Sequence, residues 1–301
     1  MTNPLYLLTG AAGFLGSHIC SQLLERGDHV RAFVLKGDPS IKYIPKEVEI
    51  FEGDLCNESD CEKLFKVEKG IQTICIHCAS MVSVNPDFNQ KLIDVNVGGT
   101  ENMLNAAKNH PECIKFVYIS STGTIPELPK GQKIKEIAQY VPYDDNKVIG
   151  WYSRSKAMAT QKVLDACIVS PTCILGPVDN AIGEITRTVL RIVKGEMKVG
   201  IDGSFNLCDV RDLARGVILA ADKGKKGESY ILGNEEVTLK QLCQLLQDEL
   251  HCEGCQKFLP IEQAQMIAQK MEQKAATKGT KPVLTSFSIY IQKHEQEQLI
   301  H

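Results

Sequence analysis

The stretch Thr9-Gly10-Ala11-Ala12-Gly13-Phe14-Leu15-Gly16 decides the fold, because it joins a short apolar run to a segment with helical spacing. The run at residues 5–9 is typical of a buried strand. The segment at 14–25 places its apolar residues at helical intervals, and Gly27 ends it. In this order, strand, glycine-rich turn and helix bring the free N–H groups of the helix start toward a phosphate. The stretch therefore predicts a dinucleotide-binding loop.

The glycines of this loop have separate tasks in a phosphate-binding turn. Gly10 permits the tight turn, Gly13 lets the backbone approach a pyrophosphate, and Gly16 lets the helix pack on the strand. Phe14 and Leu15 begin the helix, so their N–H groups are candidates for contact with the cofactor. The alternative is a glycine-rich turn that binds nothing, and the flanking strand and helix argue against it.

Segments typical of strands and helices alternate along the first part of the chain. Further strands are expected at 29–35, 48–52, 73–76 and 115–120, and helices at 58–67 and 92–108, followed by a helix that carries Tyr152 and Lys156 and ends near Ala166. This alternation predicts an α/β fold, with a doubly wound parallel sheet of the Rossmann type over residues 1–173. Residues 174–301 are expected to form mainly a small substrate-binding lobe that includes a strand at 229–232. A later segment at about 205–222 is expected to return to the first domain.

Composition and charge exclude several classes of function. The chain has 34 basic and 37 acidic residues, a net charge of −3, and its basic residues are spread along its length. We therefore expect no nucleic-acid partner and no membrane partner. No apolar run approaches the roughly 18 residues of a membrane span, and no secretory leader or transit peptide is visible. Twelve cysteines scattered through apolar segments favour reduced thiols in a cytoplasmic protein over a disulfide scaffold.

Two groupings of cysteine and histidine have the residue types of a metal site. Cys75, His77 and Cys78 lie on an expected buried strand, where alternate residues face opposite sides and cannot close a tetrahedral site. His251 and the pair Cys252-x-x-Cys255 lack a second pair of ligands at zinc-finger distance. We therefore predict no metal site.

The residue that follows the second strand bears on the choice between NAD and NADP. An NAD site expects a carboxylate about 20 residues beyond the glycine loop, where it accepts hydrogen bonds from the ribose hydroxyls. Lys36 stands there instead, and a cation favours the 2′-phosphate of NADP. Arg31 is a second cationic candidate, while Asp38 lies near enough to keep NAD open. We predict NADP, with NAD as the alternative.

A tyrosine, a lysine and a serine form the candidate catalytic group. Tyr152 and Lys156 are four residues apart, so one helix places both side chains on the same face. A phenol has a pKa near 10, and an adjacent ammonium favours its ionised form, so the pair can exchange a proton with a carbonyl or alcohol oxygen. Ser121 follows a strand end, where it could hydrogen-bond that oxygen. The alternatives are a solvent-facing Tyr/Lys pair and a serine that only caps the loop, as expected for Ser120.

The glycine spacing, the Ser-Ser-Thr strand end and Tyr-x-x-x-Lys together resemble the extended short-chain dehydrogenase/reductase family, within the NAD-dependent epimerase/dehydratase superfamily. The likeness covers about residues 5–240. It implies that Tyr152 is the general acid/base and that Ser121 orients the reacting oxygen. It also implies that Lys156 lowers the pKa of the tyrosine and holds the nicotinamide ribose.

The same resemblance implies further cofactor contacts and an assembly. The implied contacts follow the third, fourth and sixth strands, at Asp54, Leu55, Cys78, Ala79, Ser80, Pro171 and Cys173. Asn96 resembles the family's structural asparagine. A homodimer through the helices at 92–108 and 154–166 is the expected assembly.

The resemblance extends to function. The strand-end and loop motifs are closest to dihydroflavonol reductase and its bacterial relatives, which implies an NADP-dependent oxidoreductase that reduces a carbonyl or oxidises a secondary alcohol of a small molecule. One alternative is a sugar-nucleotide epimerase with retained NAD. The other is a non-catalytic NAD(P)-sensing protein, although binding alone has no need of Tyr152.

Two segments are shorter than the family pattern. The helix expected to end near Ala166 runs almost directly into a strand expected from Cys167, whereas such connections usually take about 2 to 6 residues. The region after Phe287 is also short for a substrate lobe. Both departures concern the substrate pocket and not the cofactor loop.

Overall fold

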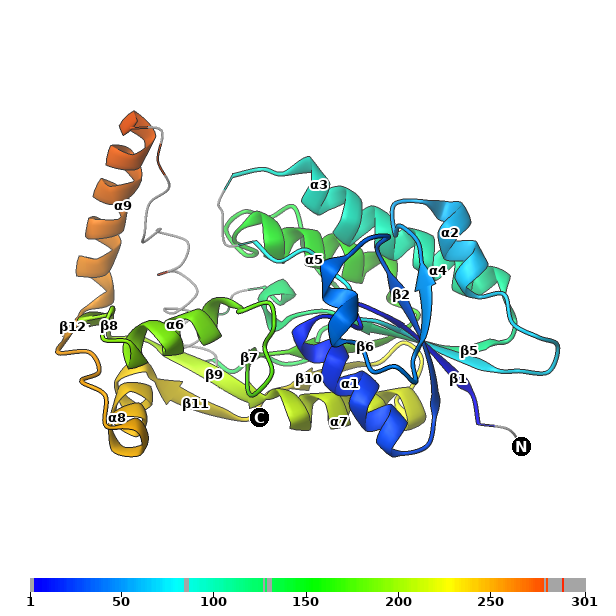
Figure 1. The fold of residues 1–301 in the computed structure, drawn as a ribbon. Helices are drawn as coiled ribbons and strands as arrows, with labels where there is room; N and C mark the ends of the chain where they lie inside the picture. Colours follow the sequence, from blue (N-terminus) through cyan, green and yellow to red (C-terminus); the bar gives the residue numbers. More distant parts are fainter. Residues whose placement is uncertain are drawn as a thin grey trace.

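A computed structural model describes residues 3–83, 87–126, 128, 132–278, 280 and 289. Its centre is a seven-stranded parallel sheet in the order β3-β2-β1-β4-β5-β6-β10 (Figure 1). The strands are β1 (Leu5–Thr9), β2 (His29–Val34), β3 (Glu49–Glu52), β4 (Thr73–His77), β5 (Cys113–Ile119), β6 (Cys167–Pro171) and β10 (Ser229–Leu232). The order reverses between β1 and β4, as the expected doubly wound Rossmann-type sheet requires. The fold class is therefore confirmed.

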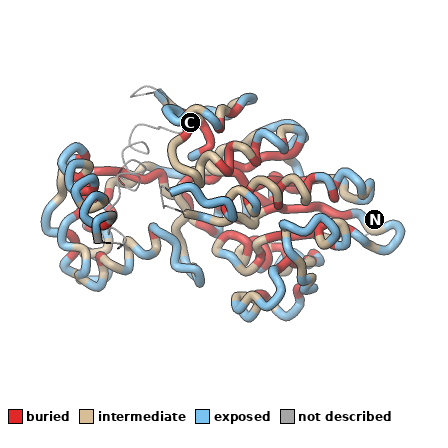
Figure 2. Tube along the Cα trace, turned by 90° about the horizontal axis from the view of Figure 1, so that it is seen from above, coloured by how far each residue is buried: buried red, intermediate tan, exposed pale blue. Residues whose placement is uncertain are grey.

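Helices cover both faces of this sheet. One face carries α1 (Phe14–Glu25) and α7 (Val210–Lys223), and the other carries α2 (Glu58–Leu64), α4 (Gly99–Asn109) and α5 (Trp151–Lys162) (Figure 1). Alternate residues of β1 serve the two cores: Tyr6 and Leu8 pack toward α1 and α7, and Leu7 packs toward the opposite helices. Figure 2 shows these strands as the buried centre of the molecule.

The short elements near the sheet edge are 3₁₀ and π turns. The 3₁₀ turn η1 (Pro39–Tyr43) follows β2, and η3 (Thr122–Thr124) follows β5. The helix expected at 92–108 is divided into α3 (Gln90–Ile93), a π-helical turn η2 (Asp94–Gly98) and α4. Single π turns inside helices are frequent at functional sites.

The remaining elements form two small sheets and three helices beside the main sheet. The sheets are β11-β9-β7, with β7 (Cys173–Leu175), β9 (Ser204–Asp209) and β11 (Glu235–Thr238), and β12-β8, with β8 (Val199–Ile201) and β12 (Lys257–Leu259). Around them pack α6 (Glu184–Val193), α8 (Leu239–Leu250) and α9 (Ile261–Lys278), with separate hydrophobic clusters (Figure 1).

The structure differs from the sequence predictions in three segments. Of the segment expected at about 205–222 to return to the first domain, α7 packs on the main sheet, but β9 pairs with β7 and β11 in a small sheet. The strand at 229–232 was expected in the small lobe, but as β10 it pairs with β6 at the edge of the main sheet. Helix α5, which carries Tyr152 and Lys156, ends at Lys162 and not near Ala166, so residues 163–166 connect it to β6 by a loop of ordinary length. The departure after Phe287 lies outside the described residues, apart from Ile289.

Within the described ranges, no helix is long and apolar enough to cross a bilayer. Among the same residues, no group of three or more histidine, cysteine or acidic side chains is arranged to hold a metal ion. All twelve cysteines are free thiols.

Candidate active site

The glycine loop fits tightly between β1 and the segment after β4. Gly10 has a φ of +72°, and a Cβ atom at this position would lie 2.8 Å from the backbone nitrogen of Ala79. A Cβ atom on Gly16 would lie 2.0 Å from the carbonyl oxygen of Gly10. Both positions therefore require glycine, for the turn and for the close approach of α1. Gly13 is less constrained, since its Cβ atom would lie 3.2 Å from the Gly10 oxygen.

The amino terminus of α1 is open to an anion. Gly13 is the N-cap residue, so no side chain caps the helix, and the first turn contains no acidic residue. The N–H groups that begin the helix at Phe14 and Leu15 thus keep their partial positive charge toward the sheet edge. A pyrophosphate fits the chemistry of this cradle.

Three residues on or after β2 were candidates to contact the adenosine ribose, and their surroundings differ. Lys36 is exposed after the strand end, and Asp38 accepts a hydrogen bond from the backbone nitrogen of Ser40 (2.8 Å) as the cap of η1. Arg31 does not fit the role of a second cation at this edge. Its guanidinium contacts Glu49 (2.9 Å) and donates to the carbonyl of Leu64 (3.0 Å).

The turn after β3 is fixed against the helices on its face of the sheet. The Asp54 carboxylate accepts a hydrogen bond from the backbone nitrogen of Cys56 (2.8 Å). The carbonyl of Leu55 accepts from Asn102 Nδ2 (2.8 Å). The expected adenine-side residues therefore belong to an ordered turn at the carboxyl edge of the sheet.

The two serines after β5 have different surroundings. Ser120 is buried, and its hydroxyl lies 2.7 Å from Thr160 Oγ1, so it joins the strand to α5. Ser121 is half-buried and accepts a hydrogen bond from the backbone nitrogen of Gly123 (3.2 Å). Its own O–H proton is not used by that bond. Ser121 therefore caps η3 and can still donate to a ligand oxygen.

Lys156 is buried in the centre of the site, with 2% of the residue exposed. Among the described residues, the one hydrogen-bond acceptor of its Nζ is the carbonyl of Ile119 (2.6 Å), and Nζ lies 4.3 Å from the centre of the Tyr118 ring. Burial lowers the pKa of Lys156 to about 7. An ammonium has three donors, so Lys156 keeps two for the hydroxyls of a nicotinamide ribose. This unsatisfied donor capacity fits the cofactor that the sequence predicts.

Tyr152 differs from the prediction in one respect. Burial raises its pKa to about 12, and a hydrogen bond with Ser80 acts more weakly in the opposite direction. Lys156 was expected to lower this pKa, but it is not among the groups that shift it, and it is engaged with Ile119 and Tyr118. The phenol is therefore protonated at neutral pH. Ser80, expected only beside the cofactor, also contacts the phenol.

The segments after β4 and β6 complete the edge. The backbone N–H groups of Cys78 and Ala79 both donate to Thr9 Oγ1, at 3.1 and 3.0 Å, so they hold the glycine loop. The carbonyl of Pro171 accepts from Thr122 Oγ1 (3.2 Å), and Cys173 begins β7. The structure thus gathers the expected site residues along one edge of the sheet.

Sequence reasoning missed a set of buried polar residues beneath this edge. His77 lies with its Nδ1 2.8 Å from Thr9 Oγ1 and its Nε2 3.0 Å from Thr100 Oγ1. Asn96, expected as structural, donates to Ser155 Oγ (3.0 Å), whose hydroxyl donates to the carbonyl of Tyr152 (2.7 Å). A histidine that ends a buried strand opposite a threonine was the available signal.

Comparisons with known proteins give a family and relatives. A model described as the NAD dependent epimerase/dehydratase family matches residues 6–233. The chain is 32% identical over 251 residues to sterol demethylase protein B of Methylococcus capsulatus, covering 80% of this chain and 73% of that protein. It is also 32% identical over 246 residues to a putative dihydroflavonol 4-reductase of Synechocystis, covering 78% and 69%. The crystal structure of gox2253 superposes with a TM-score of 0.82 at 28% identity, covering 99% of this chain and 90% of that one.

Proposed function

The chain belongs to the NAD dependent epimerase/dehydratase family as an NAD(P)-dependent enzyme of the extended short-chain dehydrogenase/reductase type, and we propose that it reduces a small-molecule carbonyl. The observation that carries the proposal is that half-buried Tyr152 and buried Lys156 are four residues apart on α5, which packs against η3, the turn that Ser121 caps. The similarity to a putative dihydroflavonol 4-reductase supports the same class. The reverse reaction, oxidation of a secondary alcohol, uses the same groups.

The proposed roles follow from the protonation states of the side chains. The pKa of Tyr152 is about 12, so its phenol holds a proton at neutral pH and can donate it to a carbonyl oxygen as negative charge develops there. Ser121 donates a hydrogen bond to the same oxygen and fixes its position. Lys156 binds the nicotinamide ribose through its free donors. The chemistry that the cofactor would supply at this site is hydride transfer to the carbonyl carbon.

The nucleotide that the purified protein retains tests the proposal against an epimerase. An epimerase reuses its cofactor in each cycle, whereas a reductase exchanges it at every turnover. We therefore expect denatured protein to release little nucleotide, or partial NADP, when the supernatant is quantified by chromatography. Stoichiometric NAD would contradict the reductase and support the epimerase.

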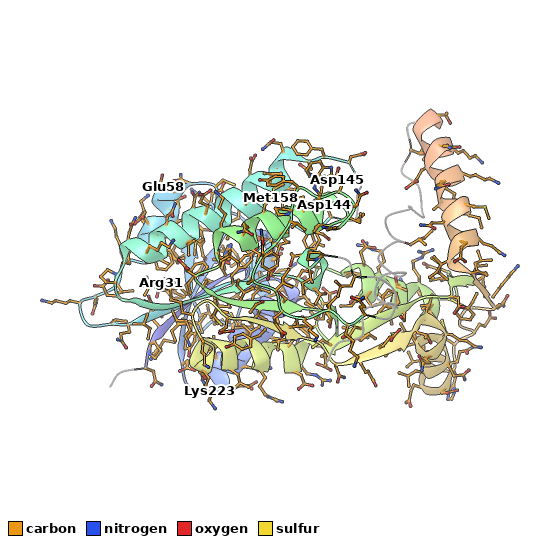
Figure 3. The ribbon with its side chains drawn as sticks, turned by 180° about the vertical axis from the view of Figure 1, so that it is seen from behind. Arg31, Glu58, Asp144, Asp145, Met158 and Lys223 are labelled. Atoms are coloured by element: carbon orange, nitrogen blue, oxygen red, sulfur yellow. The ribbon has the colours of Figure 1, made fainter. Side chains whose placement is uncertain are left out.

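We propose NADP as the cofactor because Lys36 is an exposed cation directly after β2. Lys36→Glu is expected to weaken NADP binding by about tenfold and to leave NAD binding unchanged or improved, since one charge-assisted contact to a phosphate is lost. Equilibrium titration with each nucleotide measures the effect. Lys223→Glu, on the exposed end of α7, is the charge-matched control (Figure 3). Equal losses for NAD and NADP would contradict the assignment.

A homodimer through α4 and α5 is also proposed, from the family resemblance and the half-buried Met158 on α5 (Figure 3). Sedimentation velocity at micromolar concentration is expected to give the dimer mass. Met158→Glu is expected to give the monomer, because a charge would be buried in the interface. Met266→Glu, on the exposed side of α9, is the control. A wild-type monomer would refute the proposal.

A further inference from the structure

We infer that His77 is a positioning residue that couples the glycine loop to the start of the catalytic helix through a directed chain of buried hydrogen bonds. The inference rests on the proposed function, since it concerns the dinucleotide loop and the helix that carries Tyr152. His77 and Thr9 are paired at the carboxyl ends of β4 and β1, where the strand order reverses. His77 is 1% exposed.

The hydrogen-bond partners of Thr9 fix the state of the imidazole. Thr9 Oγ1 accepts from the backbone nitrogens of Cys78 and Ala79, which uses both of its lone pairs. Its own proton must therefore be donated to His77 Nδ1, 2.8 Å away. Nδ1 is then unprotonated, so the ring proton lies on Nε2 and is donated to Thr100 Oγ1 at 3.0 Å. Thr100 in turn donates to the carbonyl of Asn96 (2.7 Å).

The chain continues from Asn96 to the residue that carries the phenol. The Asn96 amide donates to the carbonyl of Met81 (2.9 Å) and to Ser155 Oγ (3.0 Å), and its oxygen accepts from the nitrogen of Met81 (2.7 Å). Ser155 donates to the carbonyl of Tyr152 (2.7 Å). The π turn η2 places the Asn96 side chain between these partners. A displacement of Thr9 is thus transmitted through ordered contacts to the first turn of α5.

The groups around His77 keep it neutral. Its ring stacks on Tyr118 at 5.8 Å with an interplanar angle of 27°, and the ammonium of Lys156 lies on the Tyr118 ring. Burial and then the charge of Lys156 lower the pKa of His77 to about 3. Burial also raises the pKa of two adjoining groups, the Tyr118 phenol and the Cys78 thiol, the latter to about 12. The connection therefore keeps the same direction across the physiological pH range.

The experiment uses ADP as a ligand that occupies only part of the site. ADP carries the adenosine and pyrophosphate of the dinucleotide but no nicotinamide ribose, so it cannot reach Lys156. Any effect of ADP on α5 must then pass through the protein. Hydrogen exchange measured by mass spectrometry, with and without saturating ADP, follows the glycine loop at 10–16 and the helix start at 151–155 separately.

Two substitutions interrupt the series of hydrogen bonds from Thr9 to Tyr152, and two control substitutions leave it intact. His77→Phe keeps a ring on Tyr118 and removes both hydrogen bonds, while Thr100→Val removes the acceptor of Nε2 with little change in volume. Thr100→Ser restores the hydroxyl. His110→Phe makes the same ring exchange outside the chain, where His110 lies beside Glu62. If His77→Phe does not fold, Thr100→Val and Thr100→Ser decide the question.

In the wild type, Thr100→Ser and His110→Phe, ADP is expected to slow exchange in both segments, by about threefold or more. In His77→Phe and Thr100→Val, ADP is expected to protect the loop but no longer the helix start. A purely structural role would alter exchange without ligand and leave the effect of ADP on the helix intact, which overturns the inference. The inference is also overturned if ADP does not change hydrogen exchange at residues 151–155 of the wild type. If ADP does not change hydrogen exchange in the wild-type glycine loop at 10–16, the result counts against the dinucleotide site and the proposed function.

Discussion

Replacing Tyr152 with phenylalanine is expected to lower kcat by roughly 10²- to 10⁴-fold, the usual contribution of a positioned general acid, and to leave dinucleotide affinity within about threefold. In the proposed mechanism the phenol donates the proton, and its pKa of about 12 keeps it protonated at neutral pH. Phenylalanine keeps the ring on α5, so the backbone contact from Ser155 is retained.

The measurement is oxidation of NADPH with a panel of ketones, beside a binding titration. Tyr143→Phe is the control, because Tyr143 is 77% exposed and the change removes the same hydroxyl. Turnover that survives Tyr152→Phe with unchanged kcat would refute the proposed mechanism. A matched loss of dinucleotide affinity would assign the tyrosine to binding and not to proton transfer.

The cofactor loop could be predicted from the sequence because its determinants are local. A glycine with φ of +72° and a second glycine whose Cβ atom would overlap a carbonyl are backbone requirements that a glycine spacing records directly. The parallel sheet follows from alternation for the same reason. The position of β10 could not be predicted in this way. Ser229–Leu232 pairs with β6, which lies about 60 residues earlier in the sequence, and nothing in these four residues indicates that partner.

The pKa values of Tyr152 and Lys156 could not be predicted from the sequence, because their spacing does not show how deeply they are buried. The spacing of four positions from Tyr152 to Lys156 suggests that the ammonium lowers the phenol pKa. In the structure, burial outweighs every other influence on both groups: it raises the pKa of the tyrosine and lowers that of the lysine. The series of hydrogen bonds through His77 could not be predicted from the sequence for a related reason, because these bonds join residues of four separate segments.

Replacing Lys156 with methionine is expected to stabilise the ligand-free protein while it weakens dinucleotide binding by about tenfold or more. Lys156 is 2% exposed and its ammonium has one described acceptor, so burial of the charge is expected to cost more than that hydrogen bond returns. Below pH 7, the free energy of unfolding is expected to rise by about 2 kcal/mol in the variant. The donors that fit a ribose are lost in the same change.

The pH dependence separates this effect from ordinary repacking. The pKa of Lys156 falls from 10.5 in the unfolded chain to about 7 in the folded protein, so between these values the unfolded chain binds more protons. Wild-type stability from this group therefore rises as pH increases from 7 to 10.5. The advantage of Lys156→Met should be largest below pH 7 and should disappear toward pH 10.5. Urea unfolding of both proteins across this range measures it.

The matched control is Lys162→Met, in the last turn of the same helix, where Nζ contacts Glu101 (3.0 Å) and half of the side chain is exposed. Its effect on stability should be small and nearly constant with pH, because an exposed ion pair contributes about 0 to 1 kcal/mol. The contrary outcome is that the free energies of unfolding of the wild type and Lys156→Met differ by an amount that does not change with pH. That result would show that burial of the ammonium does not destabilise the folded protein. Binding of the ribose hydroxyls could then not act by offsetting an unfavourable burial of the ammonium. The loss of dinucleotide affinity in Lys156→Met would need another cause.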